Sequence, residues 1–259
     1  MSNLKHSIWC PGIRRQDPLA KGLVGYWPMW EGAGSRVMDL AGGNQGTTSN
    51  VTWEMGPHGP ITTYNGSTSY IAGGSCIALE AGSICMRLRS TDTSWNPQYG
   101  FMLQGADATV FGVTIPDAAA QKFRGQFQFV SVVATAGYVA GQWYDVAVTY
   151  DGSALKLYID GLWNNQTVDT KRTMPVSTMT IGNWAAYSTA LQGSIEYVSL
   201  YDRALSPAEV KSLYQDPYRL ITPRKMFPVS VAAPAGVAVP ALLEGGMFAG
   251  GFQTIGGGF

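Results

Sequence analysis

Carboxylates are the residues of this chain that could do chemistry, and their spacing in the sequence argues against catalysis. Cleavage of a glycosidic bond needs two carboxyl groups facing each other across it, one to donate a proton and one to attack or activate water. The best local candidate is the segment 194–198, which carries Glu196 alone, while Asp145 and Glu54 are isolated in the sequence. No nucleophile elbow is present, and neither of the two histidines lies in a triad motif. We therefore predict that the chain is not an enzyme.

Aromatic residues in segments of turn composition suggest a different chemistry. Sugars stack their C–H faces on exposed aromatic rings, while amide side chains bind their hydroxyl groups. Trp95 and Tyr99 lie in TDTSWNPQYG, and Trp163 and Asn164 lie in DGLWNNQ. We predict these four residues as glycan contacts. The alternative is that the rings are buried in the core or in a subunit contact.

Charge and cysteine content exclude several other classes of partner. The 17 basic residues are balanced by 17 acidic ones, so there is no basic excess for nucleic acid. The N-terminal segment lacks the apolar core of a signal peptide, and no apolar run is long enough to cross a bilayer. These features predict a protein made in the cytoplasm with no membrane partner. Cys10, Cys76 and Cys85 match no zinc spacing and are expected to be free thiols.

Alternating residues and turn signals predict a fold made of short strands. Segment 143–150 alternates, Asp-Gly follows at 151–152, and segment 155–159 alternates again before a second Asp-Gly. This order predicts an antiparallel hairpin. Further predicted strands are 22–27, 84–89, 99–103, 110–115, 126–133 and 193–201. Antiparallel strands with few helices between them favour a two-sheet sandwich.

One helix is well signalled near the C-terminal end of the strand region. Ser206 is an N-cap, Pro207 occupies the first helical position, and Glu209 completes a capping box. Asp216-Pro217 ends the helix. We divide the chain into an N-terminal arm at 1–21, a β-sandwich domain at 22–214 and an extended C-terminal arm with a Gly/Phe-rich tail at 215–259.

Three ordered segments resemble a known superfamily. They are GLVGYWPMWEGAGSRVMDLAGGNQGT, WYDVAVTYDGSALKLYIDG and MTIGNWAAYSTALQGSIEYVSLYDRALSPAEVKSLY. Together they resemble the laminin-G-like jelly rolls of the concanavalin A-like lectin/glucanase superfamily. The resemblance implies an all-β, two-sheet antiparallel jelly roll with one short C-terminal helix and extended terminal arms. It says little about function, because this fold carries lectins, adhesion modules, enzymes and structural proteins.

The same resemblance implies a structural calcium ion, the one cofactor that we consider. Calcium takes several oxygen ligands from carboxylates, amides and carbonyls. Glu31, Asp39 and Asn44 lie on a Gly-rich loop, and Asn65 and Glu196 are further candidate ligands. The last two stand where the family commonly carries other residues. The alternative is that Asp39 and Asn44 form turns.

The segments outside the sandwich suggest assembly. The exit LYQDPYRLITPRKMF resembles the C-terminal boundary of laminin-G-like proteins encoded by tailed bacteriophages. This resemblance implies a non-enzymatic virion protein, a capsid decoration or head fibre, with capsid or other virion proteins and further copies of itself as partners. A carbohydrate-binding or adhesion module is the alternative, and a glycoside hydrolase is ranked last. Predicted assembly contacts are Arg14, Arg15, Arg219, Arg224, Phe248, Phe252 and Phe259, the phenylalanines acting as apolar anchors.

Overall fold

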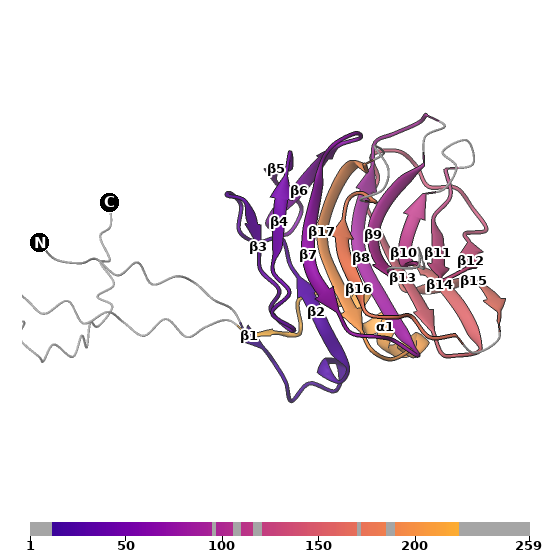
Figure 1. Cartoon of the computed structure of the whole chain (residues 1–259). Coiled ribbons are helices and arrows are strands. Elements are labelled where there is room, and N and C mark those ends of the chain that lie inside the picture. The colour runs from indigo at the N-terminus through magenta and orange to yellow at the C-terminus, as the bar shows by residue number, and fades with distance from the viewer. Residues whose placement is uncertain are drawn as a thin grey trace, which may run out of the picture. The chain divides into compact units, whose positions relative to one another are not determined.

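Two antiparallel sheets of eight strands face each other in this computed structural model, which describes residues 12–94, 97–105, 110–115, 121–169, 172–184 and 190–222. Sheet I has the order β15 (Leu162–Val168), β14 (Ala154–Ile159), β13 (Tyr144–Tyr150), β8 (Gly82–Ser90), β17 (Gln192–Tyr201), β6 (Pro60–Asn65) and β5 (Thr52–Met55), with β2 (Leu23–Trp27) also paired to β17. Sheet II has the order β12 (Val130–Val133), β11 (Arg124–Phe127), β10 (Val110–Ile115), β9 (Gln98–Gly105), β16 (Ser177–Ile181), β7 (Tyr70–Cys76), β4 (Gly46–Ser49) and β3 (Arg36–Val37). Figure 1 shows the two layers, and the predicted all-β jelly-roll class is confirmed.

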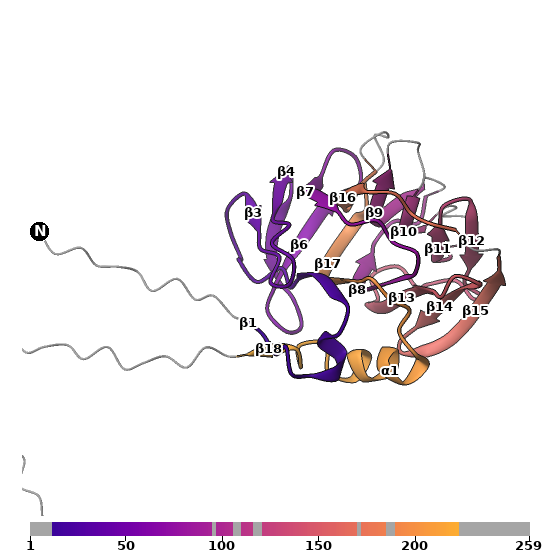
Figure 2. The same cartoon turned by 60° about the horizontal axis from the view of Figure 1, so that its bottom comes forward.

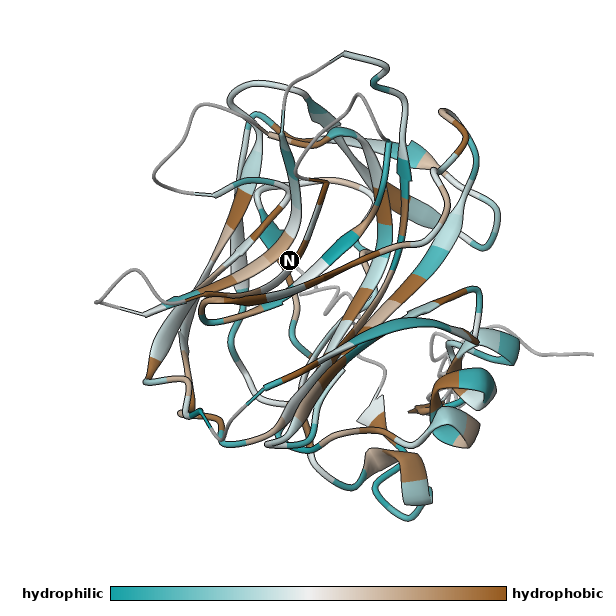
Figure 3. Ribbon diagram, turned by 90° about the vertical axis from the view of Figure 1, so that its right-hand side faces the viewer, coloured by the Kyte–Doolittle hydropathy of each residue, from teal (hydrophilic) through white to brown (hydrophobic). Residues whose placement is uncertain are grey.

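The main core lies between the sheets and follows from the two-residue period of the strands. On β8, Ile84, Met86 and Leu88 point into this core, whereas Cys85 and Arg87 point to the outer face. Figure 3 shows hydrophobic and hydrophilic residues alternating along many of the strands. The predicted hairpin at 143–159 is confirmed as β13 and β14, with its larger apolar set facing the core.

The segment 126–133 differs from its prediction as one strand. It folds as the end of β11, a tight turn and β12, with Phe127 paired to Val130. Gln128 adopts a positive φ of 52°, which permits a two-residue connection between the strands. Phe129 is consequently 75% exposed at the tip of the hairpin. The two-residue turn shifts the phase of the alternation, so Phe127 and Val130 share a face although one continuous strand would place them on opposite faces.

A second, smaller core lies on the outer side of sheet I. The helix α1 (Pro207–Gln215) packs Val210 and Leu213 against Cys85, Ala147 and Tyr158. Figure 2 shows α1 lying against this side of the sandwich. The helix has nine residues, and no helix in the described ranges is long and apolar enough to cross a membrane. It covers only part of the sheet, so the neighbouring part of the outer face lies outside this second core.

Residues from both predicted arms meet at the edge of the domain. The strand β1 (Gly12–Ile13) pairs with β18 (Ile221–Thr222), and the 3-10 helix η1 (Pro18–Ala20) follows β1. Arg219 places a guanidinium nitrogen 3.0 Å from Asp17 Oδ2 and so ties the two segments together. The two ends of the described chain therefore lie side by side.

The capping box of α1 is confirmed, and it includes a cation that the sequence motif does not contain. The Ser206 hydroxyl accepts from the Glu209 amide, and the Glu209 carboxylate accepts from the Ser206 amide. Arg203 donates to both oxygens of Glu209, at 2.7 and 3.0 Å. The bond to Arg203 is the main cause that lowers the pKa of Glu209 from 4.5 to about 2; burial opposes it, and the bonds to Ser206 add to it.

We expect Glu209→Gln to reduce the free energy of unfolding by about 1 kcal/mol at pH 7, because it removes the carboxylate that pairs with Arg203, while glutamine can still complete the capping box. Because the folded pKa is depressed, this stabilisation is present above pH 4.5 and is lost as the pH falls through about 2. Urea unfolding at pH 7, 4 and 2 measures the difference between variant and wild type. Lys211→Gln, at an exposed position of α1, is the control. A difference that stays constant across this pH range would contradict the assignment.

Candidate functional site

A buried ion cluster on the outer face of sheet I joins three adjacent strands. Arg87 of β8 donates to Asp145 of β13, and its Nε lies 3.0 Å from Oε2 of Glu196 on β17. The side chains of Asp145 and Glu196 are 7% and 1% exposed, against 20% for Arg87. Carboxylates this deeply buried need a compensating charge, and the single guanidinium supplies it to both.

Further donors complete the cluster. The Tyr197 hydroxyl donates to Asp145 at 2.6 Å, the Tyr218 hydroxyl donates to Glu196 at 2.7 Å, and His58 Nδ1 lies 2.6 Å from Glu196. Burial raises the pKa of Asp145, and the bonds from Tyr197 and Arg87 offset this only in part. The same carboxylate bonds add to burial in raising the pKa of Tyr197 and Tyr218.

A β-bulge places Glu196 in the cluster. The register between β17 and β8 pairs Ile195 with Leu88 and then Tyr197 with Arg87, so Glu196 is the extra residue. Ile195 faces the core, and both Glu196 and Tyr197 contact groups on the outer face. Bulges re-aim side chains in this way. Without the bulge, Glu196 and Tyr197 would point to opposite faces.

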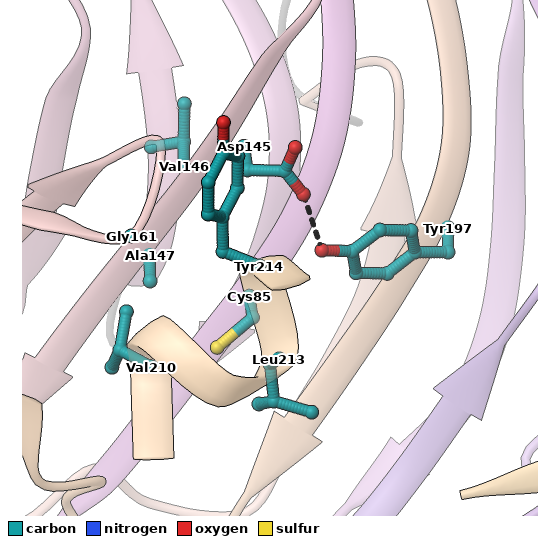
Figure 4. Close-up of a pocket in the computed structure, with 9 residues that line it drawn as sticks. All are labelled: Cys85, Asp145, Val146, Ala147, Gly161, Tyr197, Val210, Leu213 and Tyr214. Atoms are coloured by element: carbon teal, nitrogen blue, oxygen red, sulfur yellow. Dashed lines mark hydrogen bonds between the residues drawn. The ribbon is translucent and has the colours of Figure 1, made fainter. Parts of the chain in front are cut away.

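A cavity beside the cluster is too small for a ligand. Figure 4 shows it between α1 and sheet I, with Asp145 directed toward the Tyr197 hydroxyl. Its volume of about 10 Å³ is at the lower limit for one water molecule. Cys85 lines it, and burial raises the pKa of this thiol to about 12. Cys76 is likewise buried and free, as predicted, whereas Cys10 lies outside the described residues.

Beside the ion cluster, polar side chains form a row across five neighbouring strands of sheet I. The strand register places Arg89 of β8 opposite Ser194 of β17, Ser194 opposite Thr63 of β6, and Thr63 opposite Thr52 of β5. Directly opposed residues share a face, so all four point outward. Trp143, which precedes β13, extends the row because its ring centroid lies 5.3 Å from Cζ of Arg89. We call these five residues the outer row.

Hydrogen bonds and a loose ion pair link the outer row. Arg89 Nη2 donates to the Ser194 hydroxyl at 3.2 Å, and that hydroxyl lies 3.1 Å from the Thr63 hydroxyl. The Trp143 ring also lies 5.7 Å from Cζ of Arg87, so two guanidinium groups hold the half-buried indole. Glu54, on β5, places Oε2 3.8 Å from Nη2 of Arg89. The outer row thus combines an aromatic ring, a cation, hydroxyl groups and an adjacent carboxylate on one surface.

The predicted glycan contacts do not come together in one place. Tyr99 of sheet II is 7% exposed and packs edge-on against Trp184, which follows β16, with ring centroids 5.4 Å apart. Trp163 is 58% exposed on the edge strand β15 of sheet I. The side-chain oxygen of Asn164 accepts from the Thr135 amide at 2.9 Å, while Trp95 lies outside the described residues. Of the four, Trp163 is the side chain with a large open surface in the described structure.

Among the predicted calcium ligands, Asp39 and Asn65 bind backbone amides in turns, and Glu196 belongs to the ion cluster. Asp39 accepts from four backbone amides, those of Tyr26, Ala41, Gly42 and Asn44. Glu31 accepts from the Met38 amide, and Asn65 Oδ1 accepts from the amides of residues 67–69. The described residues contain no group of three His, Cys, Asp or Glu side chains that could hold a metal ion. The calcium site stays a prediction without a gathered set of ligands.

The predicted assembly residues divide into a packed set and a set outside the description. The Arg15 guanidinium donates to the Ala41 carbonyl at 2.7 Å, and Arg219 pairs with Asp17. Arg14 donates its backbone amide to the Leu220 carbonyl. Arg224, Phe248, Phe252 and Phe259 lie outside the described residues.

The sandwich, the closing helix and the sequence agree on one family. Residues 65–211, more than half of the chain, match the family described as the concanavalin A-like lectin/glucanases superfamily. The chain belongs to this family. No curated protein matches the chain by sequence.

Solved structures resemble the sandwich at low sequence identity. Trypanosoma rangeli sialidase in complex with the inhibitor DANA is 15% identical, with a TM-score of 0.60 over 76% of this chain and 33% of that chain. Domain 4 of AbnA, a GH43 extracellular arabinanase from Geobacillus stearothermophilus solved with arabinotriose, is 17% identical, with a TM-score of 0.59 over 74% and 98% of the two chains. The chain thus spans about a third of the sialidase. At these identities the likeness establishes the fold alone.

The prediction that the chain is not an enzyme is contradicted. Solved structures that share its fold include a sialidase and one domain of an arabinanase, so the fold is compatible with an enzyme. The prediction relied on acids being isolated in sequence, and the fold brings two of them, Asp145 and Glu196, to the same arginine. Spacing in the sequence therefore gives no ground for excluding hydrolysis.

We expect Arg87→Met to lower the free energy of unfolding by about 3–5 kcal/mol, because it leaves two buried carboxylates without their cation. Urea unfolding at pH 7 measures the effect. Arg89→Met is the matched control, since this side chain is 31% exposed and its nearest carboxylate lies 3.8 Å away. Equal losses in the two variants would show that the cluster does not depend on Arg87.

Proposed function

We propose that this chain is a carbohydrate-binding protein and that its ligand lies across the outer row. The observation that carries the proposal is the half-buried Trp143 indole, held beside hydroxyl groups and a guanidinium on one sheet face. An apolar ring with a few well-placed polar groups is the usual composition of a small-ligand site. The opposed faces of a sugar ring, one apolar and one bearing hydroxyls, match this composition.

The rigidity of the outer row supports the proposal. Its residues come from neighbouring strands, where side-chain positions are fixed more firmly than on loops. Adjacent strands lie about 4.8 Å apart, so five strands give the row a length of roughly 19 Å. This length suits several sugar units better than one. The family also contains lectins and glucanases, and the arabinanase domain that shares the fold was solved with arabinotriose.

We expect Trp143→Ala to weaken glycan binding at least tenfold, because it removes the ring against which a sugar packs. A glycan array finds the ligands, and titration calorimetry with the best of them gives the dissociation constants. The variant also loses two cation–π contacts, so thermal unfolding must show that it still folds.

Trp163→Ala is the matched control and tests the second candidate surface. Trp163 is the more exposed of the two rings and lies on β15, two strands from β13. If Trp163→Ala abolishes binding and Trp143→Ala does not, the glycan site is at the edge strand and the outer row is not the site. A silent array with the wild-type chain would end the proposal.

We also propose that the two arms attach the domain to a larger assembly, with a tailed-phage virion as the first candidate. The pairing of β1 with β18 supports this idea, because the chain enters and leaves the domain at neighbouring positions. Both arms can then reach one partner surface. The resemblance of the exit segment to phage-encoded proteins points to the virion as the location.

Removal of residues 223–259 is expected to abolish co-sedimentation with phage particles and to leave the thermal unfolding of the sandwich nearly unchanged. The removed segment contains none of the contacts described for the two cores. Removal of residues 1–11 alone serves as the comparison for the other arm. Full co-sedimentation of a chain lacking both segments would contradict anchoring by the arms.

A further inference from the structure

Glu54 and Arg89 form a pair that is too far apart for a direct hydrogen bond. Their nearest oxygen and nitrogen are 3.8 Å apart, whereas a charge-assisted bond measures about 2.7–2.9 Å. The side chains are 48% and 31% exposed, so both reach solvent. Arg89 donates instead to the Ser194 hydroxyl. The pair thus offers one acceptor and one donor at a separation that a bridging hydroxyl group fits.

The Arg89 guanidinium can also donate further hydrogen bonds. Its contacts with Ser194 and Glu54 both use Nη2, and its Nε is buried without a hydrogen-bond partner, so a ligand reaches this 31% exposed side chain only at its terminal nitrogens. A guanidinium has five N–H groups. Arg87 differs, because two buried carboxylates neutralise it. Of the two arginines under the Trp143 ring, Arg89 is the one able to engage a ligand.

The charges around the outer row disfavour an acidic ligand. Arg87 and Arg89 contribute two positive charges, and Glu54, Asp145 and Glu196 contribute three negative ones. These five groups sum to one negative charge. A carboxylate-bearing sugar placed on Arg89 would meet Glu54 at short range, and like charges at such a distance repel. With a neutral sugar bound, the negative charge of Glu54 and the positive charge of Arg89 continue to offset each other.

We propose that the Glu54–Arg89 pair selects neutral glycans, by accepting a hydrogen bond from one sugar hydroxyl and donating to the same or an adjacent one. The proposal rests on the proposed function and names the ligand class of that same site. Hydroxyl groups are both donors and acceptors, so they can satisfy both members of the pair. Trp143 then supports the apolar face of the sugar, and the partly exposed Thr63 hydroxyl adds a polar contact. The fully buried Ser194 hydroxyl positions Arg89 and Thr63.

The test compares neutral and acidic glycans on the full chain. The array carries lactose with sialyllactose, and neutral arabino- and gluco-oligosaccharides with oligogalacturonate. We expect the neutral members to bind, with affinities that change little between low and high salt because no net charge is neutralised. Glu54→Gln and Arg89→Gln should each weaken neutral binding roughly tenfold, the effect of losing a hydrogen bond to a charged group. Lys211→Gln, on exposed α1, removes a charge elsewhere and should change nothing.

The variants separate this inference from the proposed function. Glu54→Gln should also improve the binding of the acidic glycans, because it removes the repelling carboxylate. If the wild type prefers acidic glycans through a Trp143-dependent site, or if Glu54→Gln leaves neutral binding unchanged, the selectivity proposal is overturned and carbohydrate binding stands. If no glycan binds the wild type, both proposals fail. Thermal unfolding of each variant excludes loss of the fold as the cause.

Discussion

The centre of sheet I depends on one buried arginine that neutralises two carboxylates. Asp145 and Glu196 come from the strands on either side of β8, and Arg87 lies between them. Removing two carboxylates from water costs several kcal/mol each, and only a well-placed cation with further hydrogen bonds offsets the cost. The Tyr197 and Tyr218 hydroxyls provide such bonds. Because Tyr218 follows α1, the cluster also fixes the segment that leads out of the helix. Arg87 of the cluster also contacts the Trp143 ring.

Local patterns predicted the local structure well. The hairpin of β13 and β14 followed from two alternating segments around an Asp-Gly turn, and α1 followed from its capping box. The ends of these elements depend on residues close in sequence. The hairpin at 126–133 was missed because its turn consists of Gln128 and Phe129. Neither residue is a Gly or Asn, the types that signal such a turn. A glutamine with positive φ, unlike Asp160 in its Asp-Gly pair, leaves no mark that a single sequence reveals.

The candidate site could not be predicted because it depends on register. Arg87, Asp145 and Glu196 lie more than fifty residues apart along the chain, and only the order of β13, β8 and β17 brings them together. The one usable signal was the two arginines at alternate positions of β8, an otherwise uncharged strand. The solvent exposure of the aromatic side chains could not be predicted from the sequence either. Tyr99 and Trp163 stand in segments of similar turn composition, yet one is buried against Trp184 and the other is open to solvent.

The pairing of Gly12 with Thr222 has a consequence for the evolution and engineering of the domain. The entire sandwich enters and leaves through positions one strand spacing apart, about 5 Å. A unit with such adjacent ends can be inserted into a surface loop of another protein without stretching it. Its own ends can equally be joined by a short linker and the chain reopened at a surface turn such as 151–153, giving a circular permutant with the same sheets. The sandwich can therefore be inserted into another protein or circularly permuted, because its sheets do not depend on which strand comes first.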